Sequence, residues 1–419
     1  MDDTMVDLDT FRRQARAWIA ANLDRREGAN GQINAQLEDR SAADIARARV
    51  LQRRLFDGGY AGISFPRECG GRGLSATHEQ VFREEAAGYE LPDFGGAGNV
   101  TFGPIARSIV AHADEAFVHR HLPRILSGEE IWCQLYSEPD AGSDLPGVRT
   151  SATRDGDKWR ITGAKVWSTG AYYADWGMCL ARTDWAAVKR RGLTWFAVPM
   201  NAEGLSVRRI LQIDGSAGFC EEFLDDVVIP NDAIIGGLND GWAVAQTMLV
   251  YERGAGEEFT GAVEPRDLAP DLVALARQVG RVQEPIVRQL IARSQAQDFA
   301  RYHLGKRIAQ QLMTSTSPQP AVAAYGKLAL GVFAADRGRA AMEIAGADAL
   351  VWPTTSEMPM SAKGFLNARM TCIAAGTNEM QRNAIGERVL GLPREPSFDL
   401  TKPFGDVVRD ARTWDGRVC

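Results

Sequence analysis

The stretch KWRITGAKVWSTG, Lys158 to Gly170, belongs to a region after Ile131 in which the helical pattern of the sequence is lost. Together with WGMCLAR, LTWFAVPM and EEFLDDVVIP, it is short and rich in aromatic and β-branched residues. Turn signals such as Asp155-Gly156-Asp157 separate these segments. They predict a compact antiparallel β-domain over residues 132–242.

Helical patterns flank this region on both sides. Near the amino terminus, Asp9 or Thr10 is a candidate cap for a helix with one apolar stripe. The stripe consists of Phe11, Ala15, Trp18, Ile19 and Leu23. Ser41, followed three positions later by Asp44, predicts a capping box at the start of a second helix. After Trp242 the helical period returns and continues to about residue 392.

This order of helices, strands and helices predicts three domains. We expect an N-terminal helical domain over residues 1–131 and the β-domain over 132–242. A C-terminal helical domain is expected over 243–395 and a tail over 396–419. A length of 419 residues agrees with such a division, at roughly 150 residues per domain.

Composition and charge exclude several classes of protein. The net charge of -6, from 48 basic and 54 acidic residues, argues against a general nucleic-acid binder. Six scattered cysteines without a CxxC pair, and only five histidines, predict reduced thiols and no metal site. The first residues, MDDTMVDLD, lack the apolar core of a signal peptide, and no apolar run reaches the roughly 18 residues of a membrane span. We therefore expect a cytoplasmic protein that does not bind membranes.

Common ligand and nucleophile motifs are absent from the sequence. There is no GxGxxG before a helix, no GxxxxGK[ST] phosphate loop and no GxSxG elbow. Any dinucleotide must therefore be held by a different architecture.

Two segments do carry polar groups in patterns that suit a planar ligand. In QLYSEPDAGSDLPGVRTSA, Gln134 to Ala152, the turn Pro139–Gly142 is flanked by the hydroxyls of Ser137 and Ser143. Such a loop exposes backbone N–H groups and hydroxyls, although it also suits an ordinary entry loop to a β-domain. In the second segment, Trp167–Thr169, an aromatic ring lies beside two hydroxyls, and this tryptophan also suits a core position.

Taken together, five segments closely resemble the acyl-CoA dehydrogenase family, in order and spacing, from Phe11 to about Pro396. They are QLYSEPDAGSDL, GAKVWSTGAYYADWGMCLARTD, EEFLDDVVIP, GWAVAQTMLVYER and AAGTNEMQRNAIGERVLGLPREP. The resemblance implies an α+β multidomain fold with an N-terminal helical domain, a middle antiparallel β-domain and a C-terminal four-helix bundle. It also implies FAD bound between the last two domains.

The resemblance further implies which residues form the site. The cofactor would be bound by Gln134, Leu135, Tyr136, Ser137, Gly142, Ser143, Trp167, Ser168, Thr169, Thr377, Asn378 and Glu379. The acyl-CoA would be bound by Ser143, Arg253, Ala375 and Gly376. The implied reaction is α,β-dehydrogenation of an acyl-CoA thioester to the 2-enoyl-CoA. A carboxylate takes a proton from Cα while a hydride leaves Cβ for flavin N5.

The sequence departs from the family at the position of the base. Many members have a glutamate directly before the Gly-Thr of the C-terminal loop, and here that residue is Ala375. A subset places the base on a helix of the third domain directly before an arginine, and that position is Glu252. We therefore expect Glu252 to be the base, with a solvated or ion-paired surface glutamate as the alternative. The Ala375 N–H remains suited to the thioester oxygen.

A second departure concerns the far end of the cofactor. The family's Arg-x-x-Phe-Gly motif is missing from QEPIVRQLIAR, Gln283 to Arg293, and its Gln-x-x-Gly-Gly-x-Gly segment is reduced to EIAGADA, Glu343 to Ala349. An acidic residue near a diphosphate is unfavourable. This pattern resembles the base-bearing subunit of a heterotetramer of two unlike acyl-CoA dehydrogenase-like chains, such as those acting on bulky, steroid side-chain-like acyl groups. A homotetramer with a divergent adenylate pocket is the alternative.

The sequence alone leaves three functions open. The first is a dehydrogenase that passes electrons to an electron-transferring flavoprotein. The second is an oxidase that reacts with oxygen, and the third is a non-catalytic subunit. The sequence does not specify the acyl group.

Overall fold

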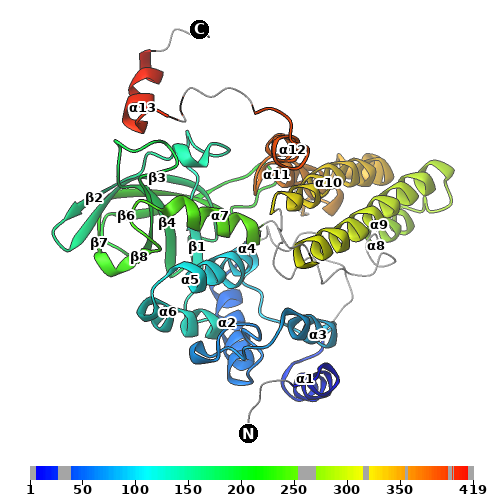
Figure 1. Ribbon diagram of the computed structural model, residues 1–419. Helices are drawn as coiled ribbons and strands as arrows, with labels where there is room; N and C mark the ends of the chain where they lie inside the picture. Colours follow the sequence, from blue (N-terminus) through cyan, green and yellow to red (C-terminus); the bar gives the residue numbers. More distant parts are fainter. Residues whose placement is uncertain are drawn as a thin grey trace.

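The protein folds as two sets of helices and one sheet, which meet around a central helix (Figure 1). The computed structural model describes residues 6–26, 39–252, 270–314, 320–353, 357–394, 399 and 401–413. The N-terminal helices lie at the bottom of Figure 1, the sheet at the left and the C-terminal helices at the upper right. This is the predicted α+β multidomain architecture. None of the described helices is long and apolar enough to cross a bilayer.

The N-terminal part is helical, as predicted. Its helices are α1 (Leu8–Asn22), α2 (Ala42–Asp57), α3 (Ala76–Ala86), α4 (Gly95–Val100), a π-helical turn (Thr101–Ile105), α5 (Ala106–His112) and α6 (Glu115–Ser127). The cap of α1 is Asp7, whose carboxylate accepts from the N–H groups of Asp9 and Thr10. The predicted caps are therefore wrong by two or three positions, because those two residues already lie in the first turn. The predicted capping box of Ser41 and Asp44 is confirmed.

The middle part is one twisted sheet with strand order β6-β7-β3-β2-β4-β5-β8, and β1 pairs with β4. Its strands are β1 (Trp132–Leu135), β2 (Ser151–Asp155), β3 (Lys158–Thr169), β4 (Trp176–Arg182), β5 (Leu193–Pro199), β6 (Leu205–Ile210), β7 (Phe219–Pro230) and β8 (Ile234–Ile235). Most neighbours are antiparallel, as predicted, but β1 and β2 run parallel to β4. A parallel pair needs a long connection, so local strand patterns cannot reveal it.

Helix α7 (Gly241–Glu252) connects the sheet to the helices on either side. Its first turn is tied to β5, since the Trp195 indole donates to the Gly241 carbonyl at 2.7 Å. Its middle contacts α5, where His112 and Thr247 are hydrogen-bonded at 2.7 Å. The residues of α7 are almost all apolar, which suits a helix that is covered from several sides.

The C-terminal part is a group of helices around α10, which contacts α8, α9, α11 and α12. These helices are α8 (Pro270–Gln278), α9 (Pro285–Thr314), α10 (Ala323–Ala345), α11 (Met360–Ile373) and α12 (Asn378–Ala384). The last helix, α13 (Phe404–Thr413), lies in the predicted tail and packs on the β-domain. There Phe404 stacks on Trp185 and covers the buried guanidinium of Arg182.

Candidate active site

Two of the predicted cofactor segments lie side by side in the sheet. The chain leaves β1 through Tyr136 and Ser137, and the Ser137 carbonyl accepts a hydrogen bond from Val166 N at 2.9 Å. Val166 directly precedes Trp167 on β3. The structure thus joins Gln134–Ser143 to Trp167–Thr169, which are about thirty residues apart in the sequence.

A buried ion pair holds this junction. The Lys165 ammonium donates to the Tyr136 carbonyl at 3.0 Å, to the Leu180 carbonyl at 2.7 Å and to Glu138 Oε1 at 2.8 Å. The Glu138 carboxylate also accepts from two backbone N–H groups, those of Arg149 and Thr150. Burial opposes ionisation of Glu138, yet Lys165 and these donors lower its pKa. Four segments of the β-domain therefore meet at one charged pair.

The sequence analysis missed Lys165 and Glu138, although a signal for Lys165 exists. Along β3, the odd-numbered residues Trp159, Ile161 and Lys165 are buried, and their neighbours are more exposed. A lysine on the buried face of a strand is rarely without a partner, so this alternation alone indicated a structural ion pair.

A β-bulge between Val166 and Ser168 turns Trp167 outward. Trp167 has a φ of 68° and is 57% exposed, so it is not a core residue in this structure. Because of the bulge, Ser168 faces inward and its hydroxyl donates to Glu222 Oε2 at 2.9 Å. An exposed indole at the end of a strand is an apolar face on which a planar ligand could stack.

Glu222 is a second buried carboxyl that the sequence did not reveal. It is fully buried on β7, where burial raises its pKa to about 8 against the opposing effects of the Ser168 hydroxyl and the Lys165 charge. A carboxyl with this pKa is mostly protonated at neutral pH. It therefore adds no negative charge to the interior beneath the predicted flavin-lining strand.

The third predicted cofactor segment begins α12. Thr377 caps this helix by accepting from Met380 N at 3.2 Å, and Asn378 lies against Gly331 of α10. The Glu379 side chain is 79% exposed and lies 3.6 Å from Arg382. A hydrogen bond of 3.0 Å from Asn367 of α11 to Asp214 joins this region to the β-domain.

Two predicted cofactor residues contain buried polar atoms without a partner among the described residues. These atoms are Gln134 Nε2 and Asn378 Oδ1, a donor and an acceptor. Buried polar groups usually find a partner, and these two are among nine such atoms in the described residues. A flavin ring has both N–H and C=O groups at its edge, so one donor and one acceptor are compatible with such a ligand.

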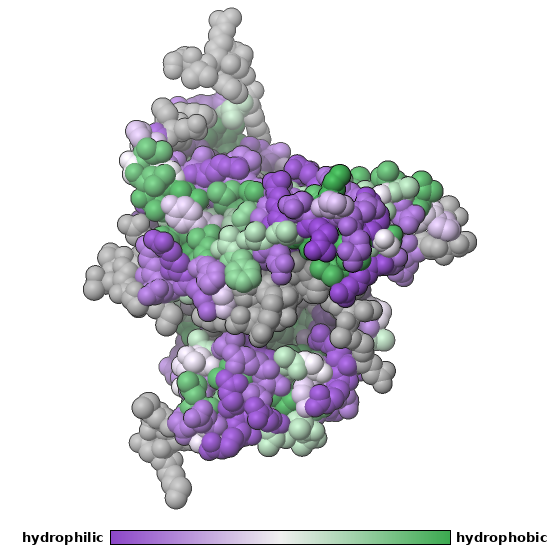
Figure 2. Space-filling view, turned by 90° about the vertical axis from the view of Figure 1, so that its right-hand side faces the viewer, coloured by the Kyte–Doolittle hydropathy of each residue, from purple (hydrophilic) through white to green (hydrophobic). Residues whose placement is uncertain are grey.

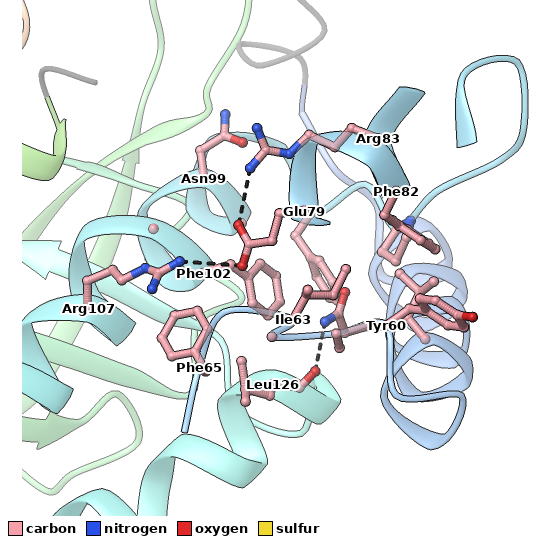
Figure 3. A pocket seen from close by; sticks show the side chains of 18 of the residues that line it. Tyr60, Ile63, Phe65, Glu79, Phe82, Arg83, Asn99, Phe102, Arg107 and Leu126 are labelled. Carbon is pink, nitrogen blue, oxygen red and sulfur yellow. Dashed lines mark hydrogen bonds and ion pairs between the residues drawn. The ribbon is translucent and has the colours of Figure 1, made fainter. Parts of the chain in front are cut away.

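A cavity of about 1110 Å³ opens between the N-terminal helices and α7 (Figure 3). Six aromatic residues contribute to its wall, namely Tyr60, Phe65, Phe82, Phe94, Phe102 and Tyr251. Its polar residues include Glu79, Arg83, Asn99, Arg107 and Glu252. Because these residues come from α3, α4, α5, α7 and the loop after α2, the cavity could not be predicted from any local pattern.

Glu252, the predicted base, is the last residue of α7 and lines this cavity beside Tyr251. Tyr136 of the first cofactor segment is close enough that burial, followed by the Glu252 charge, raises its pKa well above the usual value. The Tyr136 hydroxyl donates to the Met248 sulfur one turn earlier on α7. Glu252 therefore lines the cavity, and its charge acts on Tyr136 of the predicted flavin-lining segment. Arg253, a predicted substrate residue, lies outside the described residues.

The loop after α11 has an unusual backbone. Ala375 has a φ of 55° and Gly376 a φ of 90°, both in the left-handed region. The Gln381 amide stabilises this turn by donating to the carbonyls of Ala375 and Gly376, at 3.2 and 3.0 Å. An alanine rarely adopts this conformation, so the surrounding structure imposes it.

Comparisons with known proteins agree with this architecture. Models of the acyl-CoA dehydrogenase N-terminal, middle and C-terminal domains match residues 8–129, 133–227 and 239–390. The chain is 36% identical over 397 residues to Acyl-CoA dehydrogenase IpdE1 of Mycobacterium tuberculosis, covering 93% of this chain and 99% of that protein.

Two solved structures share the fold over most of their length. One is titled "Tcur3481-Tcur3483 steroid ACAD", with a TM-score of 0.75 and 26% identity, over 93% of this chain and 98% of that one. The other is the ChsE4-ChsE5 complex from Mycobacterium tuberculosis, with a TM-score of 0.69 and 25% identity, over 94% of this chain and all of that one. With models of all three family domains matching in order, and a relative 36% identical over nearly its whole length, this chain belongs to the acyl-CoA dehydrogenase family.

Proposed function

We propose that this protein is an FAD-dependent dehydrogenase that converts an acyl-CoA thioester to the 2-enoyl-CoA, with Glu252 as the base. One observation carries the proposal. Glu252 lines the cavity and at the same time lies near Tyr136 in the predicted flavin-lining segment. A base in this reaction must reach the acyl Cα on one side of the substrate while the flavin ring faces the other.

The chain supplies the groups that make the weakly acidic α-proton removable. Glu252 accepts the proton from Cα in a cavity with a largely apolar wall, where exclusion of water strengthens a carboxylate as a base. The backbone N–H of Ala375 donates to the thioester oxygen and stabilises the negative charge that develops there. Bound FAD would supply the acceptor for the hydride that leaves Cβ. Charge stabilisation and proton removal act together.

The cofactor residues are proposed on the basis of the fit described above. The groups that we assign to FAD are the exposed Trp167 ring, Gln134 Nε2, Asn378 Oδ1 and the main-chain N–H groups of Tyr136 and Ser137, whose carbonyls are already bound. The buried pair of Lys165 and Glu138 fixes the strand ends that carry these groups. Ser168 would contribute through its main chain, because its hydroxyl is bound to Glu222.

The volume and wall of the cavity favour a bulky acyl group. Ligand pockets typically have volumes of about 300–1,000 Å³, and this one is at or above the upper end. Aromatic side chains in its wall would add apolar surface for such a group. A relative of this fold is described as a steroid enzyme, which points in the same direction.

Anaerobic mixing of the flavin-loaded protein with acyl-CoA thioesters tests the proposal. We expect loss of the oxidised flavin absorbance with at least one bulky acyl-CoA, and turnover with an electron-transferring flavoprotein or a dye as acceptor. Turnover with oxygen alone at a similar rate would favour the oxidase alternative. A protein that binds flavin yet bleaches with no thioester, alone or with its partner subunit, would favour the non-catalytic alternative.

We further propose that the functional assembly is a heterotetramer with a second acyl-CoA dehydrogenase-like chain. The turn at Glu343–Ala349 supports this, because Glu343 is exposed there and the nearby cation, Arg281, is bound to Glu284. Arg281 also donates to the carbonyls of Glu343 and Ile344. Arg281, the cation that contacts this turn within the described part of the chain, is therefore already engaged. Two structures of similar fold are named for pairs of chains.

Exposed apolar residues on the C-terminal helices also support association with another chain. Figure 2 shows hydrophobic side chains at the left and right of the upper half of this face, on either side of a hydrophilic centre. Among the exposed apolar residues are Ile286, Leu350, Val351, Ile373 and Leu390, all more than half exposed. Each is an exposed apolar side chain that a second chain could cover.

Expression of the chain alone and with genomically neighbouring acyl-CoA dehydrogenase-like chains tests the assembly. We expect little FAD in the chain alone and about one FAD per pair of chains in the co-purified complex, measured by absorbance after heat release. Full FAD occupancy in a homotetramer would contradict the proposal and favour a divergent adenylate pocket.

A further inference from the structure

Ser143 ends the predicted cofactor segment and is exposed, so the residues on either side of it determine where it lies. On one side, Glu138 and Ala141 exchange two backbone hydrogen bonds, at 3.1 and 3.0 Å. On the other side, Asp144 follows directly, and its carboxylate lies 2.5 Å from Lys189 Nζ. Lys189 belongs to the loop between β4 and β5. This loop therefore anchors the far end of the cofactor segment.

A second cation holds the residues that come next. Arg182, the last residue of β4, is fully buried, and its guanidinium donates to the Pro146 carbonyl at 2.6 Å and the Val148 carbonyl at 3.3 Å. It also donates to the carbonyls of Lys189 and Arg191, both at 3.0 Å. Burial lowers the pKa of Arg182 to about 10, so this group is still charged at neutral pH. One guanidinium thus joins the chain after the cofactor segment to the loop between β4 and β5.

The C-terminal tail, described at residues 399 and 401–413, contacts both cations. Asp399 forms an ion pair with Lys189, which therefore lies between two carboxylates. The Phe404 ring lies over the Arg182 guanidinium, with its centroid 3.9 Å from the central carbon. The main chain adds a hydrogen bond of 2.9 Å from Phe404 N to the Ala187 carbonyl. The tail is thus fastened to the same loop by its side chains and by its backbone.

The tail connects the two domains between which we place the flavin. It follows α12, whose first residues we assign to the cofactor and which packs on α10. Helix α13, in contrast, lies beside the sheet, at the upper left of Figure 1. The match to the C-terminal domain of the family ends at residue 390, so the tail lies beyond it.

We propose that the C-terminal tail positions Ser143 for the cofactor, through the two cations that it contacts. Asp399 fixes the first cation, Lys189. Phe404 fixes the second, Arg182. Both tail residues are positioning residues, and a segment that is already ordered loses less freedom when it binds a ligand. This inference rests on the proposed function, because it assumes that FAD meets Ser143, as the resemblance to the family implies.

The exposure of the two ion pairs indicates why Asp399 matters. The side chains of Lys189 and Asp399 are 12% and 15% exposed, whereas that of Asp144 is 57% exposed. Ion pairs that are open to water contribute little, so the shielded pair with the tail is the stronger restraint on the ammonium. Without Asp399, Lys189 would keep only the more exposed of its two carboxylates.

Hydrogen exchange tests the positioning in the full chain without any ligand. In Asp399→Asn, the amides of residues 144–149 should exchange about 3–10-fold faster than in the parent protein, because their anchor is weaker. Asp399→Glu retains the charge and should retain most of the protection. Lys402→Met is the matched control, since it removes a half-exposed ion pair to Asp410 within the same tail. Unchanged exchange in Asp399→Asn would overturn the proposal.

FAD affinity shows whether the positioning reaches the cofactor. The purified assembly, after removal of its flavin, is titrated with FAD and followed by flavin fluorescence. Asp399→Asn should raise Kd about 3–10-fold, the usual worth of one hydrogen bond. In a Ser143→Ala background the same change should have little further effect, because both act on one segment. An equal loss of affinity in both backgrounds would mean that the tail does not act through Ser143, and the proposal would be wrong.

Phe404→Leu tests the second anchor independently. Leucine keeps most of the buried apolar volume but removes the ring face over Arg182, so Kd for FAD should rise about 2–5-fold. Lys402→Met again serves as the control. An FAD affinity equal to that of the control in both Phe404→Leu and Asp399→Asn would refute the inference.

The outcomes separate this inference from the proposed function. If the parent assembly binds FAD and an acyl-CoA bleaches it, yet neither tail variant differs from Lys402→Met, the inference is wrong although the enzyme is a dehydrogenase. If the parent assembly binds no FAD, the proposed function fails and this inference fails with it, whatever the exchange experiment shows of the anchor.

Discussion

Lys165 and Glu138 form an ion pair inside the β-domain, with 2.8 Å between Nζ and Oε1 and almost no exposure of either side chain. The lysine comes from β3, which leads to Trp167, and the glutamate comes from the loop after β1, which carries Tyr136 and Ser137. Both segments therefore hold predicted cofactor residues. The pair therefore determines how Tyr136 and Ser137 lie relative to Trp167. It acts on the candidate site through position, without contacting the substrate.

Lys165→Met should destabilise the protein by about 3–5 kcal/mol, because it leaves the Glu138 carboxylate buried without its cation. Urea unfolding monitored by circular dichroism measures this loss. FAD content should fall in parallel, since the two strand ends lose their common anchor. Lys158→Met, at the exposed start of the same strand, is the control and should change the free energy of unfolding by less than about 0.5 kcal/mol. Equal stability of the two variants would show that the pair contributes nothing.

Glu222→Gln should stabilise the protein increasingly as pH rises from 5 to 8. The pKa of Glu222 is raised from 4.5 to about 8 by burial, so between these values the folded state binds a proton that the unfolded state has released. The contribution of this group to stability therefore falls as pH rises through that window. Glutamine remains neutral and can still accept from Ser168.

Thermal unfolding at several pH values measures the difference in free energy between Glu222→Gln and the parent protein. Glu221→Gln, one residue earlier on β7 and less buried, is the control. A difference that does not change with pH would mean that Glu222 is ionised in the folded protein.

Glu252→Gln should retain FAD but bleach it on the order of 10²–10⁴ times more slowly with substrate, because glutamine cannot accept the α-proton. Stopped-flow absorbance under anaerobic conditions measures this rate. Glu203→Gln, in an exposed turn between β5 and β6, is the control. Glu379 is the nearest rival, so a Glu379→Gln variant that loses bleaching while Glu252→Gln keeps it would overturn the assignment.

Adding Ala375→Glu to Glu252→Gln should restore part of the bleaching rate. Ala375 already has a side-chain Cβ in a left-handed conformation, so a longer side chain adds little further backbone strain. The resemblance to the family implies that a base can act from either position. No recovery, in a double variant that still binds FAD, would mean that the Ala375 position does not face Cα in this protein.

Gly331→Ala should reduce FAD binding. A Cβ at Gly331 would lie 2.2 Å from Asn378 Oδ1, the buried acceptor that we assign to the cofactor, so the asparagine would have to move. Gly364→Ala, in α11, is the matched control because its added Cβ meets no atom within 4 Å. Replacement of glycine by alanine within a helix is normally stabilising, so only the first variant should lose flavin. Unchanged flavin affinity in Gly331→Ala would remove Asn378 from the site.

The sequence by itself determined the elements and the family. Short segments rich in aromatic and β-branched residues and separated by turns predicted the strands, the spacing of Ser41 and Asp44 predicted a capped helix, and five ordered motifs predicted the three-domain fold. Such signals can be read directly because they depend on neighbours within a few residues. The alternation of buried and more exposed positions along β3 held a further signal, for the buried Lys165, which we did not use.

Only the tertiary structure decided which groups meet. The parallel pairing of β1 with β4, the partnership of Lys165 with Glu138, and the burial of Glu222 depend on contacts between distant segments. The cavity, similarly, brings Arg107 and Glu79 together with Glu252, from three helices. A local pattern specifies which face of an element is apolar, but not which other element will cover that face. The chemistry of a site formed between domains is therefore visible only once the chain has folded.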